Sequence, residues 1–533
     1  MKPEARAVAS ALVVTLGGFI FGLDAALISG GIGQISRQFG LGDMALGAVV
    51  SAPGFGVIFA LLVTGAICDR IGRKRTLLSI AFLYLFSAIS SVVAPTFELL
   101  VAARLIGGLA FTSLSVASIY IGEIAPPHMR GKLVSINQLN IVVGLFTAYF
   151  VNYGLVKVAA LDAEWVRALR IDTETWRWML GMEIVPALLW LLCLLRIHES
   201  PRWLYGTGRV AEARKVLEKV APARVVAAEL EDLGRSFAQT ERRYSLRQVF
   251  QLLFGTHLRR AVFVGVLIAT VQPLTGINAI LFYAPMVFQQ VGIGGNAAFA
   301  QSVIIGLVSI VFTVMALLLV DRVGRRWLTF TGLGWAAASL LICFWGFSNA
   351  SYILEAADLA NLPAAVDRAR LAGLVGHAFP TDVAFKDALV AALGFAQARA
   401  NESELIAAAI SVDGGMILLG IMGFIAAYNL SIGPVMWVVL SELFPTAVRG
   451  VAVTACALVV STLSYFIQQA FPWQLAHWGS AMIFLFYASC VLIGLVLLVW
   501  KLPETKNKSI EEIEAGFKEQ ASAHMRTSEE KHA

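Results

Sequence analysis

Asp69-Arg-Ile-Gly-Arg-Lys-Arg75 is repeated far downstream as Asp321-Arg-Val-Gly-Arg-Arg326. A second motif follows each copy. Glu123 precedes Arg130 by seven positions, and Glu442 precedes Arg449 by the same interval. Two different motifs that recur in the same order indicate an internal duplication. The sequence therefore predicts two homologous halves.

Long apolar runs flank both copies of the motif. Of the 533 residues, 58% are hydrophobic and only 14% are charged, whereas soluble proteins are about one quarter charged. A membrane-spanning helix needs about 20 mostly apolar residues. We therefore predict an all-α integral membrane protein whose twelve transmembrane helices form two six-helix, pseudo-symmetric halves, with spans near 8–31, 45–67, 76–94, 97–121, 133–156, 178–197, 260–290, 298–320, 328–348, 413–440, 450–471 and 478–500.

Basic residues gather in alternate loops. This pattern places both termini in the cytoplasm, because cytoplasmic loops carry an excess of Lys and Arg. It also accounts for the net charge of +6 without nucleic-acid binding. The first apolar run is longer than the apolar region of a secretory signal, so we expect a retained helix. The basic loop residues are Arg70, Arg73, Lys74, Arg75, Arg130, Lys132, Arg322, Arg325, Arg326 and Arg449.

The repeat also predicts the domain organisation. The distance between the two motifs is greater in the second half, which places an insertion at 349–412. Its apolar runs are too short to cross a membrane, so we expect a helical insertion on the outer face. The predicted segments are an N-terminal half (1–197), a cytoplasmic linker with short surface helices (198–259), a C-terminal half (260–500) and a cytoplasmic tail (501–533).

Cofactor chemistry receives no support from the sequence. The five cysteines lie in or beside apolar runs, without a CxxC pair or other metal-ligand spacing. The chain also has no GxxxxGK[ST] phosphate loop, so ATP is not the expected energy source. No nucleophile–base set appears either, so we expect neither an enzyme nor a cofactor or metal site. Two parallel repeats in a membrane chain are instead typical of secondary transporters.

Several motifs together resemble the sugar porters of the major facilitator superfamily, especially the bacterial proton-coupled pentose and hexose symporters. The resemblance extends from the first span to the tail, except for the insertion and part of the 157–176 loop. It is carried by the two repeated loops and by Phe21-Gly-Leu-Asp-Ala-Ala-Leu-Ile-Ser-Gly30, His198-Glu-Ser-Pro-Arg-Trp-Leu204, Gln272-Pro-Leu-Thr-Gly-Ile-Asn278, Gly433-Pro-Val-Met-Trp437 and Pro503-Glu-Thr-Lys506.

Asp24 lies deep in the first span. Insertion of a charged side chain at this depth costs about 2.5–3.5 kcal/mol, so an acidic residue there is a functional candidate by default. Arg104 is its expected partner, and Glu183 is a second acid at membrane depth. The resemblance implies that Asp24 carries the coupled proton, so H⁺ is the expected coupling ion. The alternative is a static Asp–Arg pair that only fixes helix packing.

The resemblance also implies a central site for a small neutral sugar or polyol. Amide groups offer both a donor and an acceptor to hydroxyl groups, and aromatic rings cover a C–H face. Lone amides in membrane helices more often join helices together. The implied substrate residues are Phe21, Gln138, Gln272, Asn278, Tyr283 and Trp437.

Charged residues of the repeated loops and nearby motifs are predicted to form ion pairs that open and close together, as a cytoplasmic latch. Glu123 is expected to pair with Arg130, and Glu442 with Arg449. The complete predicted set is Asp69, Arg70, Arg73, Glu123, Arg130, Glu199, Arg202, Asp321, Arg322, Arg325, Glu442, Arg449 and Glu504.

Some positions depart from the family pattern. Pro273 and Leu145 stand where the resembling symporters often have Gln, Val460 stands where a polar residue is common, and His198 replaces a Pro. The predicted pocket is therefore less polar, and the sugar is left open. The function implied is secondary active sugar import by proton symport, by a monomer in a bacterial inner membrane. An uncoupled facilitative porter is the alternative, and a non-transporting sugar sensor is a third reading.

Overall fold

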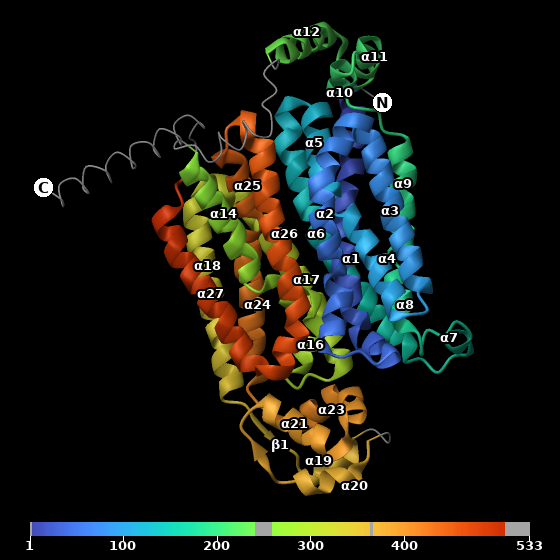
Figure 1. Ribbon diagram of the computed structural model, residues 1–533, viewed down its shortest axis with the longest axis vertical. Helices are drawn as coiled ribbons and strands as arrows, with labels where there is room; N and C mark the ends of the chain where they lie inside the picture. The colour runs from blue at the N-terminus through green and yellow to red at the C-terminus, as the bar shows by residue number, and fades with distance from the viewer. Residues whose placement is uncertain (1–2, 240–257, 363–365, 507–533) are drawn as a thin grey trace, which may run out of the picture.

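A computed structural model describes residues 3–239, 258–362 and 366–506. Within these residues, twelve helical segments are long and apolar enough to cross a membrane. Each predicted span coincides with one of them. Figure 1 shows two helical bundles side by side, with the blue-to-teal first half next to the green-to-red second half. Parts of the predicted linker (240–257) and tail (507–533) lie outside the described residues.

The first bundle contains six spans. Two of them, spans 4 and 6, are divided into shorter helices. The elements are α1 (Pro3–Phe39), α2 (Asp43–Ile71), α3 (Arg73–Val93), α4 (Phe97–Ala110), α5 (Ser113–Ile124), η1 (Pro127–Met129), α6 (Arg130–Ala159), α7 (Glu164–Ala168), α8 (Thr175–Gly181) and α9 (Ile184–Leu195).

The second bundle repeats this plan, with spans 7 and 10 divided. The elements are α14 (Arg259–Leu274), α15 (Ile277–Phe282), α16 (Ala284–Gln289), α17 (Gly295–Val323), α18 (Arg325–Ser348), α24 (Gly414–Leu430), α25 (Ile432–Leu443), α26 (Thr446–His477) and α27 (Gly479–Lys501). In span 7, Pro273 lies in the last turn of α14, and Gly276, with φ of 85°, is the N-cap of α15. A proline cannot continue the hydrogen-bond ladder, and only glycine adopts this φ without strain.

Small residues let α1 and α6 approach closely. A Cβ atom at Gly18 or Gly22 would overlap the backbone of α6, and one at Gly144 would overlap the carbonyl oxygen of Phe19. Without a hydrophobic force between helices in lipid, such close packing holds membrane helices together. Because this packing fixes α1, it also fixes the depth of Asp24.

The insertion forms a compact unit below the bundles in Figure 1. It contains more than the helices that we predicted, because three short antiparallel strands pair in the order β2-β1-β3. Pairing of Ser351 with Ser411 brings its entry and exit together, a long-range contact that periodicity cannot reveal. Its elements are β1 (Ser351–Ile353), α19 (Ala356–Asn361), α20 (Arg368–Leu371), η2 (Ala372–Leu374), β2 (Ala378–Phe379), α21 (Asp382–Leu393), α22 (Phe395–Ala400), α23 (Glu402–Ala409) and β3 (Ile410–Ser411).

We call the end of the molecule that bears this unit the insertion face, and the opposite end the terminal face. The terminal face carries the start of α1, the end of α27 and three linker helices: α10 (Pro201–Gly206), α11 (Val210–Val220) and α12 (Ala223–Gln239). Contacts between the halves gather toward the insertion face. Gln469 accepts a hydrogen bond from Ser51 at 2.7 Å and donates one to the carbonyl of Met44 at 2.7 Å.

Candidate functional site

Three ionisable side chains meet in the interior of the first bundle. Asp24 of α1 and Arg104 of α4 form an ion pair, and the two residues are only 4% and 2% exposed. Glu183 lies at the break between α8 and α9, is 4% exposed, and interacts electrostatically with both of them. The structure therefore brings together all three residues that were proposed for proton coupling.

This triad holds two carboxyl groups and one guanidinium in a buried position. Oδ2 of Asp24 and two nitrogens of Arg104, Nε and Nη2, have no hydrogen-bond partner among the described residues. Uncompensated charge is costly in such surroundings. The triad is formally neutral when one of its two carboxyl groups holds a proton, and it carries one negative charge when both are ionised.

Polar side chains of the second bundle form another buried group. Gln272 of α14 donates a hydrogen bond through Nε2 to the hydroxyl of Tyr428 on α24. Its Oε1 has no partner among the described residues, although Gln272 is only 8% exposed. Asn278 of α15 donates to Ser464 of α26 at 2.7 Å. Sequence reasoning missed Tyr428 and Ser464, because single polar residues in apolar helices leave no spacing signal.

The other predicted substrate residues have different surroundings. Tyr283 is fully buried and donates its hydroxyl to the carbonyl of Gln468 at 2.8 Å. Phe21 and Gln138 are half-buried on α1 and α6. Trp437 of α25 is 40% exposed, and within the described residues it has no ring contact or hydrogen bond with Gln272 or Asn278. The hydrogen bonds and ring contacts of the described residues therefore do not join these six residues directly to one another.

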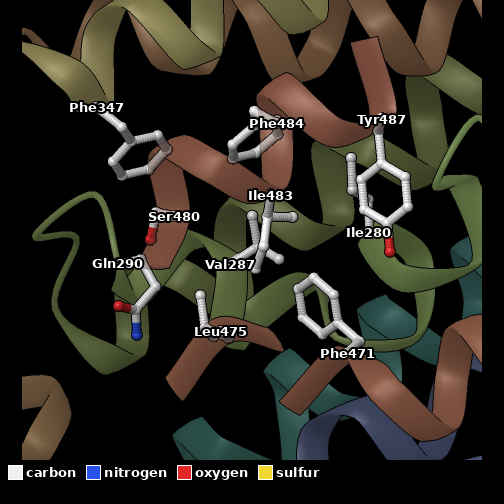
Figure 2. A pocket seen from close by; sticks show the side chains of 10 residues that line it. All are labelled: Ile280, Val287, Gln290, Phe347, Phe471, Leu475, Ser480, Ile483, Phe484 and Tyr487. Atoms are coloured by element: carbon white, nitrogen blue, oxygen red, sulfur yellow. The ribbon is translucent and has the colours of Figure 1, made fainter. Parts of the chain in front are cut away.

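A separate pocket lies between α16 and α27, near the insertion face (Figure 2). Its walls are apolar except for Gln290, Ser480 and the Tyr487 hydroxyl, and Figure 2 shows Gln290 and Ser480 at the same side. Oε1 of Gln290 has no partner among the described residues. None of the six predicted substrate residues lines this pocket, so it is distinct from the predicted sugar site.

The terminal face carries two charged clusters that repeat each other. In the first, Arg73 binds Glu123 at 2.9 Å and Asp69 at 3.1 Å. In the second, Arg325 binds Glu442 at 2.8 Å and Asp321 at 2.9 Å. These ion pairs join helices of the same half. They fasten the ends of each bundle and do not bridge the two bundles.

A carboxylate completes each cluster by capping a helix. Glu199 accepts hydrogen bonds from the backbone N–H groups of Arg73, at 2.9 Å, and Lys74, at 3.0 Å. Glu504 accepts equivalent bonds at the start of α18. A negative charge is favourable at a helix N-terminus, where N–H groups lack intrahelical partners.

The expected partners of two other arginines were wrong. Arg130 donates to the carbonyl of Ala125 at 3.0 Å, and Arg449 donates to the carbonyl of Phe444 at 3.1 Å. Glu123 pairs with Arg73 and Glu442 pairs with Arg325, because the ends of these helices meet within each half. A spacing of seven residues along the chain does not reveal which helix ends meet. Three further predicted members are exposed and belong to neither cluster: Arg70, Arg202 and Arg322.

His198 lies beside the first cluster. Burial, together with the positive charges of Lys219, Lys74 and Arg6, lowers the pKa of its imidazole. Its backbone carbonyl accepts a hydrogen bond from Tyr120 at 2.7 Å. The residue therefore remains neutral near pH 7 and adds no charge to the cluster.

Gly72→Ala should destabilise the first bundle by about 2–3 kcal/mol. Gly72 has φ of 97° and ψ of 165°, a region in which other residues cost about 1–3 kcal/mol, and a Cβ there would overlap the Glu199 carboxylate. Thermal unfolding in detergent measures the loss, and Gly324→Ala should act similarly. Gly65→Ala, in open space on α2, is the control; equal stability of the Gly72 and Gly65 variants would contradict the argument.

Comparison with known proteins agrees with this architecture. The family model described as "Sugar (and other) transporter" matches residues 10–366 and 388–517. The chain belongs to this family. It is also 32% identical to the arabinose-proton symporter of Bacillus subtilis, over 94% of this chain and 92% of the relative. The D-xylose-proton symporter of Escherichia coli K12 is 29% identical, over 95% and 94% of the two chains.

Solved structures of the sugar transporter family share the fold. The xylose transporter XylE from Escherichia coli, in a partially occluded inward open conformation, superposes with a TM-score of 0.71 at 26% identity. The match covers 95% of this chain and all of the other. XylE bound to 6-bromo-6-deoxy-D-glucose matches with a TM-score of 0.70 at 28% identity, over 97% and 100% of the chains. The protein is therefore a membrane transporter and not an enzyme.

Proposed function

We propose that this protein imports a small neutral sugar together with a proton across a bacterial inner membrane, as a monomer. The terminal face would lie in the cytoplasm, in agreement with the distribution of Lys and Arg in the loops. The observation that carries the proposal is the buried triad of Asp24, Arg104 and Glu183 in the first bundle. The relatives named as proton symporters support the same coupling ion.

The coupling step follows from the charge of the triad. Protonation of Asp24 weakens its attraction to Arg104, and the carboxylate of Glu183 then balances the positive charge of Arg104. The helices α1 and α4 can then change their relative position, which alternating access requires. When the proton leaves toward the cytoplasm, the ion pair re-forms and resets the transporter.

Sugar recognition is assigned to the amides of the second bundle. Oε1 of Gln272 is a buried acceptor that has no partner in the described part of the chain, and a sugar hydroxyl can satisfy it. Gln138 and the aromatic residues Phe21 and Trp437 would complete the site once the bundles close around the ligand. The relatives include arabinose and xylose symporters, so pentoses are the first class to test, followed by hexoses and polyols.

Uptake by proteoliposomes tests the proposal. With an inside-negative potential of 100 mV, one proton per sugar supplies about 2.3 kcal/mol, enough for about fiftyfold accumulation. We expect radiolabelled pentose to accumulate and a protonophore to abolish the gradient. Equilibration without accumulation would instead identify an uncoupled facilitative porter. Sugar binding without uptake would identify a sensor.

A further inference from the structure

The insertion contacts the first half through an ion pair and the second half through hydrogen bonds, and further ion pairs inside the insertion connect these two contacts. Arg399 of α22 pairs with Asp43, the first residue of α2 in the first half. Arg399 also pairs with Glu402 at 3.4 Å, and Lys386 lies 3.5 Å from both Glu402 and Asp382. We call these five residues the ion-pair bridge.

The other end of the bridge is fixed to the second half. Asp382 accepts hydrogen bonds from the backbone N–H of Ser480 at 3.0 Å and from its hydroxyl at 3.1 Å. It thereby caps the N-terminus of α27, where a carboxylate is favourable. Gly479, with φ of 76°, leaves room for it, because a Cβ there would overlap the carboxylate.

Further contacts attach the insertion to the second half. It continues directly from α18 and into α24, and its helices pack on α16 and α27. Ser403 donates to Gln289, the last residue of α16, at 2.8 Å. A buried apolar core inside the insertion, including Tyr352, Leu371 and Phe385, holds the unit together.

The link to the first half is of a different kind. Asp43 belongs to the opposite bundle, and its side chain and that of Arg399 are 16% and 19% exposed. When the halves rock to open the insertion face, α2 moves away from the second bundle. Asp43 must then leave Arg399, while Glu402 and Lys386 keep their partners inside the insertion.

We propose that Asp43–Arg399 is a breakable latch on the insertion face, through which the insertion favours the conformation closed at that face. The family model does not cover residues 367–387, which contain Asp382 and Lys386, whereas Asp43, Arg399 and Glu402 lie within the matched ranges. The latch acts on the conformational equilibrium and contacts none of the proposed coupling or sugar residues.

Electron–electron distance measurements on the purified full chain test the latch. Spin labels at Glu98→Cys and His477→Cys report the separation of the two halves, because both positions are exposed at the insertion face. Cys193 and Cys490, which are half-buried, are replaced by Ser in this background. The measurement needs no sugar or proton gradient, so its outcome is independent of the proposed transport function.

Asp43→Asn should raise the ratio of open to closed molecules at the insertion face by about fivefold, the change that about 1 kcal/mol produces at 25 °C. Asp387→Asn is the matched control, because Asp387 is exposed on α21 and outside the bridge. Asp43→Arg should open this face further, and Asp43→Arg combined with Arg399→Asp should restore closure. Unchanged distances in Asp43→Asn, or equal shifts in both Asn variants, would overturn the proposal.

Discussion

Asp24→Asn is expected to abolish uphill sugar accumulation while leaving sugar exchange intact. The accumulation ratio in energised proteoliposomes should fall from tens to about one, a loss of the roughly fiftyfold gradient that one proton per sugar can support at 100 mV. Exchange of labelled for unlabelled sugar, measured without a proton gradient, should continue at a rate within about threefold of the unaltered protein.

The physical reason is the charge of the triad. An amide resembles a protonated carboxyl group in shape and in lacking charge, so the variant is held in the proton-loaded form. Asp24 is only 4% exposed, and Asn fits the same space. Arg104 retains Glu183 as a nearby acid, so its charge is not left uncompensated. The variant should therefore fold and bind sugar, but it cannot release the coupled proton.

Asp162→Asn provides the control, since the Asp162 carboxylate is 91% exposed and, among the described residues, forms an ion pair only with the exposed Arg167. It carries the same change of charge and should accumulate sugar normally. If Asp24→Asn still concentrates sugar, Asp24 is not the coupling residue, and the Asp24–Arg104 pair serves only to fix helix packing. If both accumulation and exchange are lost, the residue is needed for movement of the halves and not for coupling alone.

The sequence predicted the fold from two kinds of information. Apolar runs fixed the spans, because length and hydropathy decide whether a helix can cross a bilayer. The repeated loops fixed the two halves, and the structure confirms equivalent contacts at Arg73 and Arg325. The sheet of the insertion could not be predicted, since strands of two or three residues, paired across the unit, leave no periodic pattern.

The side-chain partners were harder to predict than the helices. A charge in an apolar run is visible in the sequence, and Asp24 and Arg104 were identified in this way. The partner of Glu123, which is Arg73, was not identified, because it depends on how the helix ends meet in space. Neither Tyr428 nor the Asp43–Arg399 contact left a signal, since each depends on residues from distant segments.

Gln272→Leu is expected to weaken sugar binding by about thirtyfold, or about 2 kcal/mol, in calorimetric titration of the purified protein. Leu has a similar volume but no acceptor, so a sugar hydroxyl would lose its partner and the Tyr428 hydroxyl would lose its donor. Tyr428→Phe removes only the hydrogen bond between Gln272 and Tyr428 and keeps the amide oxygen for the sugar. It should weaken binding by only about threefold, because the Gln272 amide remains.

The control for this prediction is Gln290→Leu. Gln290 is 5% exposed, lies in the same bundle and also has an Oε1 atom without a partner among the described residues, but it lines the pocket of Figure 2. Both variants replace a buried amide by Leu, so any general loss of stability should be similar, and the two variants differ only in where the amide lies. Full affinity in the Gln290 variant would assign sugar recognition to the Gln272–Tyr428 group. Lost affinity there, with unchanged binding in Gln272→Leu, would instead show that the Gln272 amide does not hold the sugar.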